Sequence, residues 1–249
     1  LDVLKYSQSQ IPFLGKCKYN YTFTNNDNIY KDYELTVFHP FKITGWNRES
    51  VYKTFEYDNL IFRGYQEMQD AEYIHGYVSD EYVYEQLKKI IKESDAPQFI
   101  NAITMQNHGD YEGINLDNEI KIEEDIENKE MTEGVLTLIE LSSKEINKFI
   151  KYLGEHKEEP TLLIFYGDHY PGGLFDNRSE EAFITPYMVY SNFCDLEEIP
   201  EHLDLSLLYP YAKAAAGLPM TAYEKYLVSL NGETVDLNMI LSKMKGKIK

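Results

Sequence analysis

One stretch of the sequence, residues 161–173, constrains the fold more than any other. It begins with a continuous apolar run at 162–166, which is typical of a strand buried on both faces of a parallel sheet. Glycines and a proline follow and mark a loop directly after that strand. Asp168 and His169 are therefore predicted at the carboxyl end of a buried strand, the edge at which open α/β sheets bind ligands.

The adjacent Asp168 and His169 admit two interpretations. A carboxylate and an imidazole side by side can both bind one divalent cation, with ligand bonds of roughly 2.0–2.2 Å. Alternatively they form an ordinary turn, in which Asp168 caps a backbone amide and His169 is exposed. The pair alone does not decide between a metal site and a turn, so the other motifs of the chain have to be considered.

Two further strands are predicted to end near a histidine. The run at 34–38 reads as a short buried strand ended by the following proline, which places His39 at its end. The run at 98–105 is a second apolar strand, and His108 emerges just after it. Each histidine could be a hydrogen-bonded turn or loop residue. Because parallel strands share one edge, however, both are also candidates for the same site as His169.

Helices are predicted between and after these strands, at residues 49–55, 79–93, 132–153, 205–216 and 221–230. Ser79 and Thr132 are the expected N-caps of the second and third helices. A further strand is expected at 183–191. The alternation of strand and helix predicts an α/β fold with a mainly parallel sheet sandwiched by helices. We expect one domain over 1–249, with an irregular lead-in at 1–33, a core at 34–230 and a tail at 231–249.

The charge balance excludes some partners. The chain has 24 Lys and Arg against 42 Asp and Glu, a net charge of −18, which argues against nucleic-acid binding and against adhesion to anionic membranes. An anionic substrate would be repelled only within roughly 8 Å, because salt screens longer-range charge. Local cations, namely a metal and Arg48, would have to dominate. No apolar run has membrane-spanning length, so we expect this stretch of chain to be soluble by itself.

Four segments in fixed order carry a family resemblance: residues 38–52, 104–111, 165–171 and 185–192. They contain a His-Pro followed by Trp-Asn-Arg, a Thr-Met-Gln-Asn-His-Gly run, a Gly-Asp-His run and a Thr-Pro run that ends in Ser-Asn. Together they closely resemble the lipoteichoic-acid-synthase-like phosphoglycerol transferase branch of the sulfatase and alkaline phosphatase superfamily. The resemblance implies an alkaline-phosphatase-like fold and a bacterial-type enzyme on the extracellular face of the cell membrane.

The resemblance also implies roles for individual residues. A Mn²⁺, or another divalent cation such as Mg²⁺ or Zn²⁺, would be bound in part by Asp168 and His169. The residues expected to contact or line the substrate pocket are His108, Arg48, Trp46 and His39. Arginine offers a rigid fork of donors that matches phosphate oxygens, and tryptophan a flat apolar wall. The alternatives are a solvated charge for Arg48 and core packing for Trp46.

The N-terminal part of the family's catalytic domain is not recognised in this sequence. The family's nucleophilic Thr and one metal-binding Glu precede the part that matches, so no catalytic nucleophile is assigned and enzyme status stays open. We expect a C-terminal catalytic portion, missing its N-terminal part and inactive alone, whose partners are a phosphoglycerol-bearing lipid or an anionic cell-wall polymer. Membrane contact would come only through the missing N-terminal part. The alternatives are a sulfatase- or phosphatase-type hydrolase, or a degenerate relative that binds glycan or phosphoglycerol without turnover.

Overall fold

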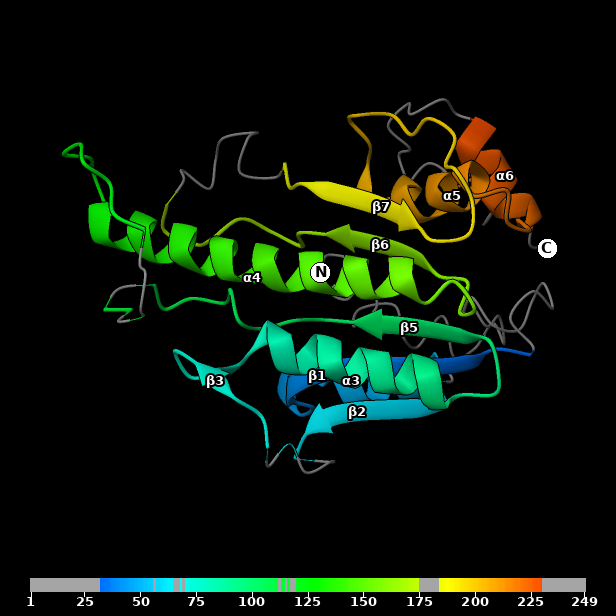
Figure 1. Cartoon of the computed structure of the whole chain (residues 1–249), viewed down its shortest axis with the longest axis horizontal. Helices are drawn as coiled ribbons and strands as arrows, with labels where there is room; N and C mark the ends of the chain where they lie inside the picture. Colours follow the sequence, from blue (N-terminus) through cyan, green and yellow to red (C-terminus); the bar gives the residue numbers. More distant parts are fainter. Residues whose placement is uncertain are drawn as a thin grey trace, which may run out of the picture. The chain divides into compact units, whose positions relative to one another are not determined.

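The computed structural model describes residues 32–55, 57–64, 68, 70–111, 113–114, 116, 120–174 and 184–229. The chain divides into two compact units, Leu1–Glu67 with Ser94–Ala102, and Met68–Glu93 with Ile103–Lys249. Figure 1 labels their elements, and each unit is described by itself. The lead-in expected at 1–33 lies outside the described residues up to residue 31, and the tail expected at 231–249 lies wholly outside them.

The first unit contains a parallel three-stranded sheet. Its strands are β1 (Glu34–Lys42), β2 (Asn59–Arg63) and β5 (Gln98–Ala102), with β1 in the middle. The central position of β1 accounts for its continuous burial over residues 35–40, since a strand flanked on both sides and covered on both faces has no solvent side. The predicted strand at 34–38 and the parallel pairing are thus confirmed.

The prediction that Pro40 ends the first strand is wrong. Strand β1 continues to Lys42, and its register against β2 shifts between His39 and Lys42. Proline lacks a backbone N–H, so it fits where the ladder is already irregular. A 3₁₀ turn, η1 (Gly45–Asn47), and helix α2 (Arg48–Thr54) follow, close to the helix predicted at 49–55.

The second unit is built around two long helices that pack together, α3 (Asp80–Glu93) and α4 (Lys129–Glu155) (Figure 1). Ser79 caps α3 as predicted, because its Oγ accepts from the backbone N of Tyr82 at 3.3 Å. Thr132 does not cap α4. That helix begins one turn earlier, and the Thr132 hydroxyl instead donates to the Asn128 carbonyl at 3.0 Å.

Strands β6 (Leu162–Tyr166) and β7 (Tyr187–Ser191) form an antiparallel pair in the second unit. The limits predicted for β6 are confirmed, whereas β7 is shorter than the run predicted at 183–191, of which residue 183 lies outside the described part. Within the described residues β6 pairs only with β7, so its environment differs from the doubly flanked parallel strand suggested by its apolar run. A short hairpin, β3 (Tyr73–Ile74) and β4 (Tyr77–Val78), precedes α3.

The chain then forms helices α5 (Leu205–Ala215) and α6 (Ala222–Ser229). Asp204 caps α5, accepting from the backbone N of Ser206 at 2.8 Å. A buried ion pair between Lys213 Nζ and Glu224 Oε1, 2.8 Å apart, joins the two helices. This ion pair therefore ties the last two described helices of the second unit together.

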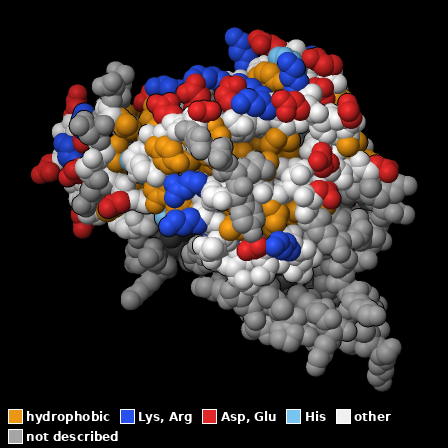
Figure 2. Space-filling model, turned by 90° about the horizontal axis from the view of Figure 1, so that it is seen from below, with side chains coloured by type: hydrophobic (Ala, Val, Ile, Leu, Met, Phe, Trp, Pro, Cys, Tyr) orange, Lys and Arg blue, Asp and Glu red, His pale blue; other side chains and the backbone are white. Residues whose placement is uncertain are grey.

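The face drawn in Figure 2 carries acidic and basic side chains interspersed with apolar ones. Within the part of the chain that the structure describes, none of the helices has both the length and the apolar character of a membrane span.

Candidate functional site

The Gly-Asp-His block lies where the sequence predicted it, directly after β6. The preceding Gly167 is fixed by two hydrogen bonds: its N–H donates to the Pro186 carbonyl at 3.1 Å, and its carbonyl accepts from Thr185 Oγ1 at 2.7 Å. A Cβ on Gly167 would lie only 3.2 Å from the Thr185 Cβ. Glycine therefore lets the loop after β6 lie tightly against the segment that leads into β7.

Asp168 and His169 present their polar atoms to solvent and to each other. Their side chains are 63% and 54% exposed, and Asp168 Oδ2 lies 3.6 Å from His169 Nε2. His169 Nδ1 lies 2.8 Å from the Tyr170 carbonyl, which can only accept a hydrogen bond. The proton is therefore placed on Nδ1, which leaves the lone pair of the neutral ring on Nε2, the nitrogen that faces Asp168.

This geometry fits two ligands of one divalent cation. Two atoms bound at roughly 2.0–2.2 Å to the same ion stand about 3–3.5 Å apart, close to the observed separation. A carbonyl that orients the other ring nitrogen is the usual outer partner of a metal-bound histidine. Among the described residues, no three His, Cys, Asp or Glu side chains gather as a metal site. Asp168 and His169 therefore have a geometry that two metal ligands could adopt, and their role as ligands stays a prediction.

His108 is exposed, but its ring is held in place. Its Nδ1 lies 2.9 Å from the Gly109 carbonyl and 3.0 Å from the hydroxyl of Tyr77, and that hydroxyl donates to the same carbonyl at 2.9 Å. Since the carbonyl only accepts, Nδ1 carries the proton. Nε2 is then the ring nitrogen that could contact a substrate oxygen.

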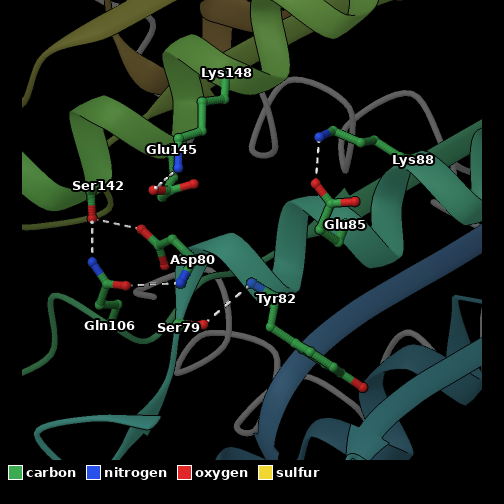
Figure 3. Close-up of polar contacts among 9 residues, drawn as sticks. All are labelled: Ser79, Asp80, Tyr82, Glu85, Lys88, Gln106, Ser142, Glu145 and Lys148. Atoms are coloured by element: carbon green, nitrogen blue, oxygen red, sulfur yellow. Dashed lines mark hydrogen bonds and ion pairs between the residues drawn. The ribbon is translucent and has the colours of Figure 1, made fainter. Parts of the chain in front are cut away.

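The residues just before His108 are fixed by buried contacts. Gln106 is 0% exposed, and its Oε1 accepts from the Asp80 backbone N at 2.9 Å (Figure 3). Its carbonyl lies 2.5 Å from His75 Nε2. Asn107 Oδ1 accepts from the Ser142 hydroxyl at 2.8 Å. The loop that carries His108 is therefore tied to α3, to α4 and to the β3–β4 hairpin.

Tyr111 links this loop to the Gly-Asp-His block. Its hydroxyl donates to the Asn107 carbonyl at 3.0 Å. Burial is the main cause that raises the pKa of Tyr111, and the negative charge of Asp168 raises it further. The hydroxyl of Tyr111 thus ties the end of the His108 loop back to Asn107.

Three of the predicted site residues belong to the first unit. His39 does not end its strand: it lies within β1, is fully buried and meets Phe62 edge-on, with ring centroids 5.8 Å apart. Trp46 lies in η1 and Arg48 opens α2, with its guanidinium 3.4 Å from the Lys42 carbonyl. Their roles in substrate binding, like those of His108, Asp168 and His169, stay predictions.

The sequence interpretation missed the residues that support His108. His75 is half-buried and contacts the Gln106 carbonyl. Asp80 is 2% exposed, although an acid in the first turn of a helix commonly serves the helix dipole at the surface. One signal was present: Ser142 lies in the apolar stripe of α4, and a buried hydroxyl needs a hydrogen-bond partner.

A parallel α/β sheet together with a strand that leads into Gly-Asp-His defines the alkaline-phosphatase-like class of proteins. The sulfatase family model matches residues 30–199. The chain therefore belongs to the sulfatase family and falls in its lipoteichoic-acid-synthase-like branch, within the alkaline phosphatase superfamily.

The relatives are consistent with that assignment. A Rhizobium meliloti protein named for cyclic beta-1,2-glucan modification is 32% identical over 56% of this chain and 22% of its own length. The lipoteichoic acid synthase-like YvgJ of Bacillus subtilis is 28% identical over 63% of this chain and 26% of its own length. The chain thus spans about a quarter of these relatives.

A solved structure shares the fold. The Streptococcus pyogenes phosphoglycerol transferase GacH, in complex with sn-glycerol-1-phosphate, superposes with a TM-score of 0.70 over 82% of this chain and 56% of GacH, at 22% identity. This likeness confirms the alkaline-phosphatase-like fold predicted from the sequence.

Proposed function

We propose that this chain is part of a metal-dependent phosphoglycerol transferase that acts on cell-envelope lipid or polymer at the extracellular face of the cell membrane. Family membership supports the class of reaction, and the name of GacH, phosphoglycerol transferase, supports the group transferred. The observation that carries the proposal is the pair formed by Asp168 and His169, whose facing atoms lie 3.6 Å apart at the end of β6.

Asp168 and His169 would hold the divalent cation, Mn²⁺ or alternatively Mg²⁺ or Zn²⁺. When bound, such an ion neutralises charge that develops on a transferring phosphoryl group. The Tyr170 carbonyl keeps the His169 ring oriented with Nε2 available. Family membership makes a divalent metal the expected cofactor, and the choice of ion belongs to the proposal.

The substrate would be bound by His108, Arg48 and Trp46, whereas His39, also expected to line the pocket, is fully buried in β1 and offers no surface to it. When the His108 ring is charged, its Nε2–H can donate to a phosphoryl oxygen or protonate a leaving oxygen, because Nδ1 is already held by Gly109 and Tyr77. The Arg48 guanidinium matches two phosphate oxygens at once, and Trp46 offers an apolar wall for glycerol. The proposal assigns no nucleophile to the residues of this chain, so transfer is a property to be measured on the full-length protein.

The test is turnover of a phosphoglycerol-bearing lipid by the full-length protein. Phosphatidylglycerol in detergent micelles serves as donor, and release of diacylglycerol is followed with Mn²⁺ and after chelation with EDTA. We expect diacylglycerol release that EDTA abolishes and Mn²⁺ restores. Asp125→Ala, an exposed acid of the same unit, serves as a control beside Asp168→Ala.

Two outcomes would contradict the proposal. Metal-dependent cleavage of p-nitrophenyl sulfate or phosphate without diacylglycerol release would indicate a hydrolase. Binding of Mn²⁺ without turnover of any of these substrates would indicate a relative that binds its ligand and does not transform it.

A further inference from the structure

A buried polar network lies directly behind the His108 loop, and the proposed chemistry makes no use of it. It joins Asp80 in the first turn of α3, Gln106 in the loop after β5 and Ser142 in the middle of α4 (Figure 3). Ser142 also contacts the exposed side chain of Asn107. All four residues belong to the second unit. Asp80 and Gln106 are 2% and 0% exposed, so each polar atom here needs a partner from the protein.

Gln106 is the centre of this network. Its Oε1 accepts from the Asp80 backbone N at 2.9 Å, and its Nε2 donates to Ser142 Oγ at 3.3 Å. The Asp80 N–H is one of the amides at the start of α3 that has no partner within the helix. One side chain therefore connects the starting turn of α3 to α4 while its own backbone leads into His108.

Ser142 makes three polar contacts, and all three can be hydrogen bonds in the observed orientation only if Asp80 is protonated. Its hydroxyl lies 2.6 Å from Asp80 Oδ2, 2.8 Å from Asn107 Oδ1 and 3.3 Å from Gln106 Nε2. A hydroxyl donates one hydrogen bond and accepts two. If Asp80 is protonated, it donates to Ser142, Gln106 donates as well, and Ser142 donates to Asn107, so that every contact is satisfied.

If Asp80 is ionised, Ser142 has two acceptors and a single proton. The proton then goes to the carboxylate, and the exposed amide of Asn107 either turns so that Nδ2 faces Ser142 or leaves Ser142 for solvent. The orientation of Asn107, the residue before His108, is thereby coupled to the charge on Asp80. We propose that Asp80, Ser142 and Gln106 are positioning residues for His108, and that the protonation state of Asp80 sets the orientation of the Asn107–His108 segment.

The surroundings of Asp80 place this change in an accessible pH range. Burial is the main cause that raises the pKa of Asp80 to about 6, and the negative charge of Glu145 on α4 adds to it, although Lys148 binds Glu145 at 2.8 Å. Tyr84 faces Asp80 from the same helix, and its own pKa is raised chiefly by burial. From the β3–β4 hairpin, His75 contacts the network only through the Gln106 carbonyl.

Two measurements on the full-length protein test this proposal. The first, which follows turnover, rests on the proposed function. Ser142→Ala should lower kcat for diacylglycerol release about 10- to 100-fold, since small displacements of a catalytic group have effects of that size. Ser143→Ala, an exposed neighbour on α4, should leave it unchanged. Asp80→Asn keeps a donor toward Ser142 and should remove the change in kcat that the wild type shows around pH 6.

The second measurement does not depend on turnover. The side-chain amide resonances of Asn107, recorded by NMR on ¹⁵N-labelled protein, should shift with pH around 6 in the wild type and lose that step in Asp80→Asn. If these resonances and the pH profile are the same in Asp80→Asn as in the wild type, the positioning role is excluded. If no diacylglycerol is released but the NMR step is present and lost in Asp80→Asn, the proposed transferase function fails and the positioning network stands.

Discussion

The two loops that carry the candidate chemistry are built in opposite ways. The His108 loop is anchored from behind by buried groups: Gln106 is tied to Asp80 and Ser142, and Tyr111 closes its far end. The Asp168 loop has an anchored glycine at its start, and then two side chains that are more than half exposed. The fold therefore holds the His108 ring in one orientation before any ligand binds. The side chains of Asp168 and His169, in contrast, would be fixed only when a cation binds to them.

This comparison predicts that substitutions in the two loops will affect activity and the free energy of unfolding in different proportions. Changes in the Asp168 loop should abolish metal binding and leave unfolding untouched, because exposed side chains contribute little to packing. Changes behind the His108 loop should reduce stability as well as activity, because they remove buried contacts.

The largest effect is expected for Asp168→Ala. Loss of a metal ligand should reduce diacylglycerol release by the full-length protein more than about 100-fold, in line with the contribution of a metal to charge stabilisation. Its free energy of unfolding in urea should stay within about 0.5 kcal/mol of the wild type. A large loss of stability would show that the side chain has a structural role, and that the comparison between the loops is wrong.

Gln106→Ala should give the reverse pattern in stability. It removes the partner of the Asp80 N–H and of Ser142 and leaves a cavity, so we expect the free energy of unfolding to fall by about 3–4 kcal/mol. Urea denaturation followed by circular dichroism measures this. Gln86→Ala, on the half-buried face of α3, is the matched control. An equal loss in the free energy of unfolding there would show that Gln106 contributes no more than an ordinary half-buried glutamine.

Asp80→Asn should change how stability depends on pH. Burial raises the folded-state pKa of Asp80 from 3.8 to about 6, so between these values the folded protein holds a proton that the unfolded chain has released. The free energy of unfolding therefore falls by about 3 kcal/mol in total as pH rises through this window, and it is constant above the window. Asp80→Asn should show no such fall. Parallel stability curves for the two proteins from pH 4 to 7 would contradict the assignment.

The smallest effect is expected for Gly134→Ala on α4. A Cβ there would lie 2.2 Å from the Tyr111 carbonyl, so the backbone of the His108 loop must move. We expect a loss of about 1–2 kcal/mol in the free energy of unfolding, typical of a local overpacking. Gly154→Ala on the same helix, where a Cβ would meet only the end of the Tyr190 side chain at 3.0 Å, should cost less.

Local patterns in the sequence were sufficient for most of the fold. The apolar run at 162–166 gave β6 with its true limits, and Ser79 and Asp204 marked the starts of α3 and α5. The partner of β6 could not be obtained in this way, because an apolar run fits a parallel neighbour and an antiparallel one equally well. Thr132 failed as a cap because packing of α4 extends the helix one turn beyond that local signal.

The exposed residues of the candidate site could be recognised from the sequence, whereas the buried residues that hold the His108 loop in place could not. Asp168, His169 and His108 belong to short runs with a family resemblance. Asp80 and Ser142 are 62 positions apart, and their 2.6 Å contact exists only because α3 packs on α4. An acid in the first turn of a helix usually serves the helix dipole, and only the tertiary structure shows that this one is buried.

The central claim is that Asp168 and His169 together bind a divalent cation, and the most direct measurement is anomalous diffraction from crystals of the full-length protein loaded with Mn²⁺. We predict one strong manganese peak within roughly 2.0–2.2 Å of His169 Nε2 and of an Asp168 carboxylate oxygen. Manganese bound elsewhere, with these two side chains in contact only with solvent, would contradict it.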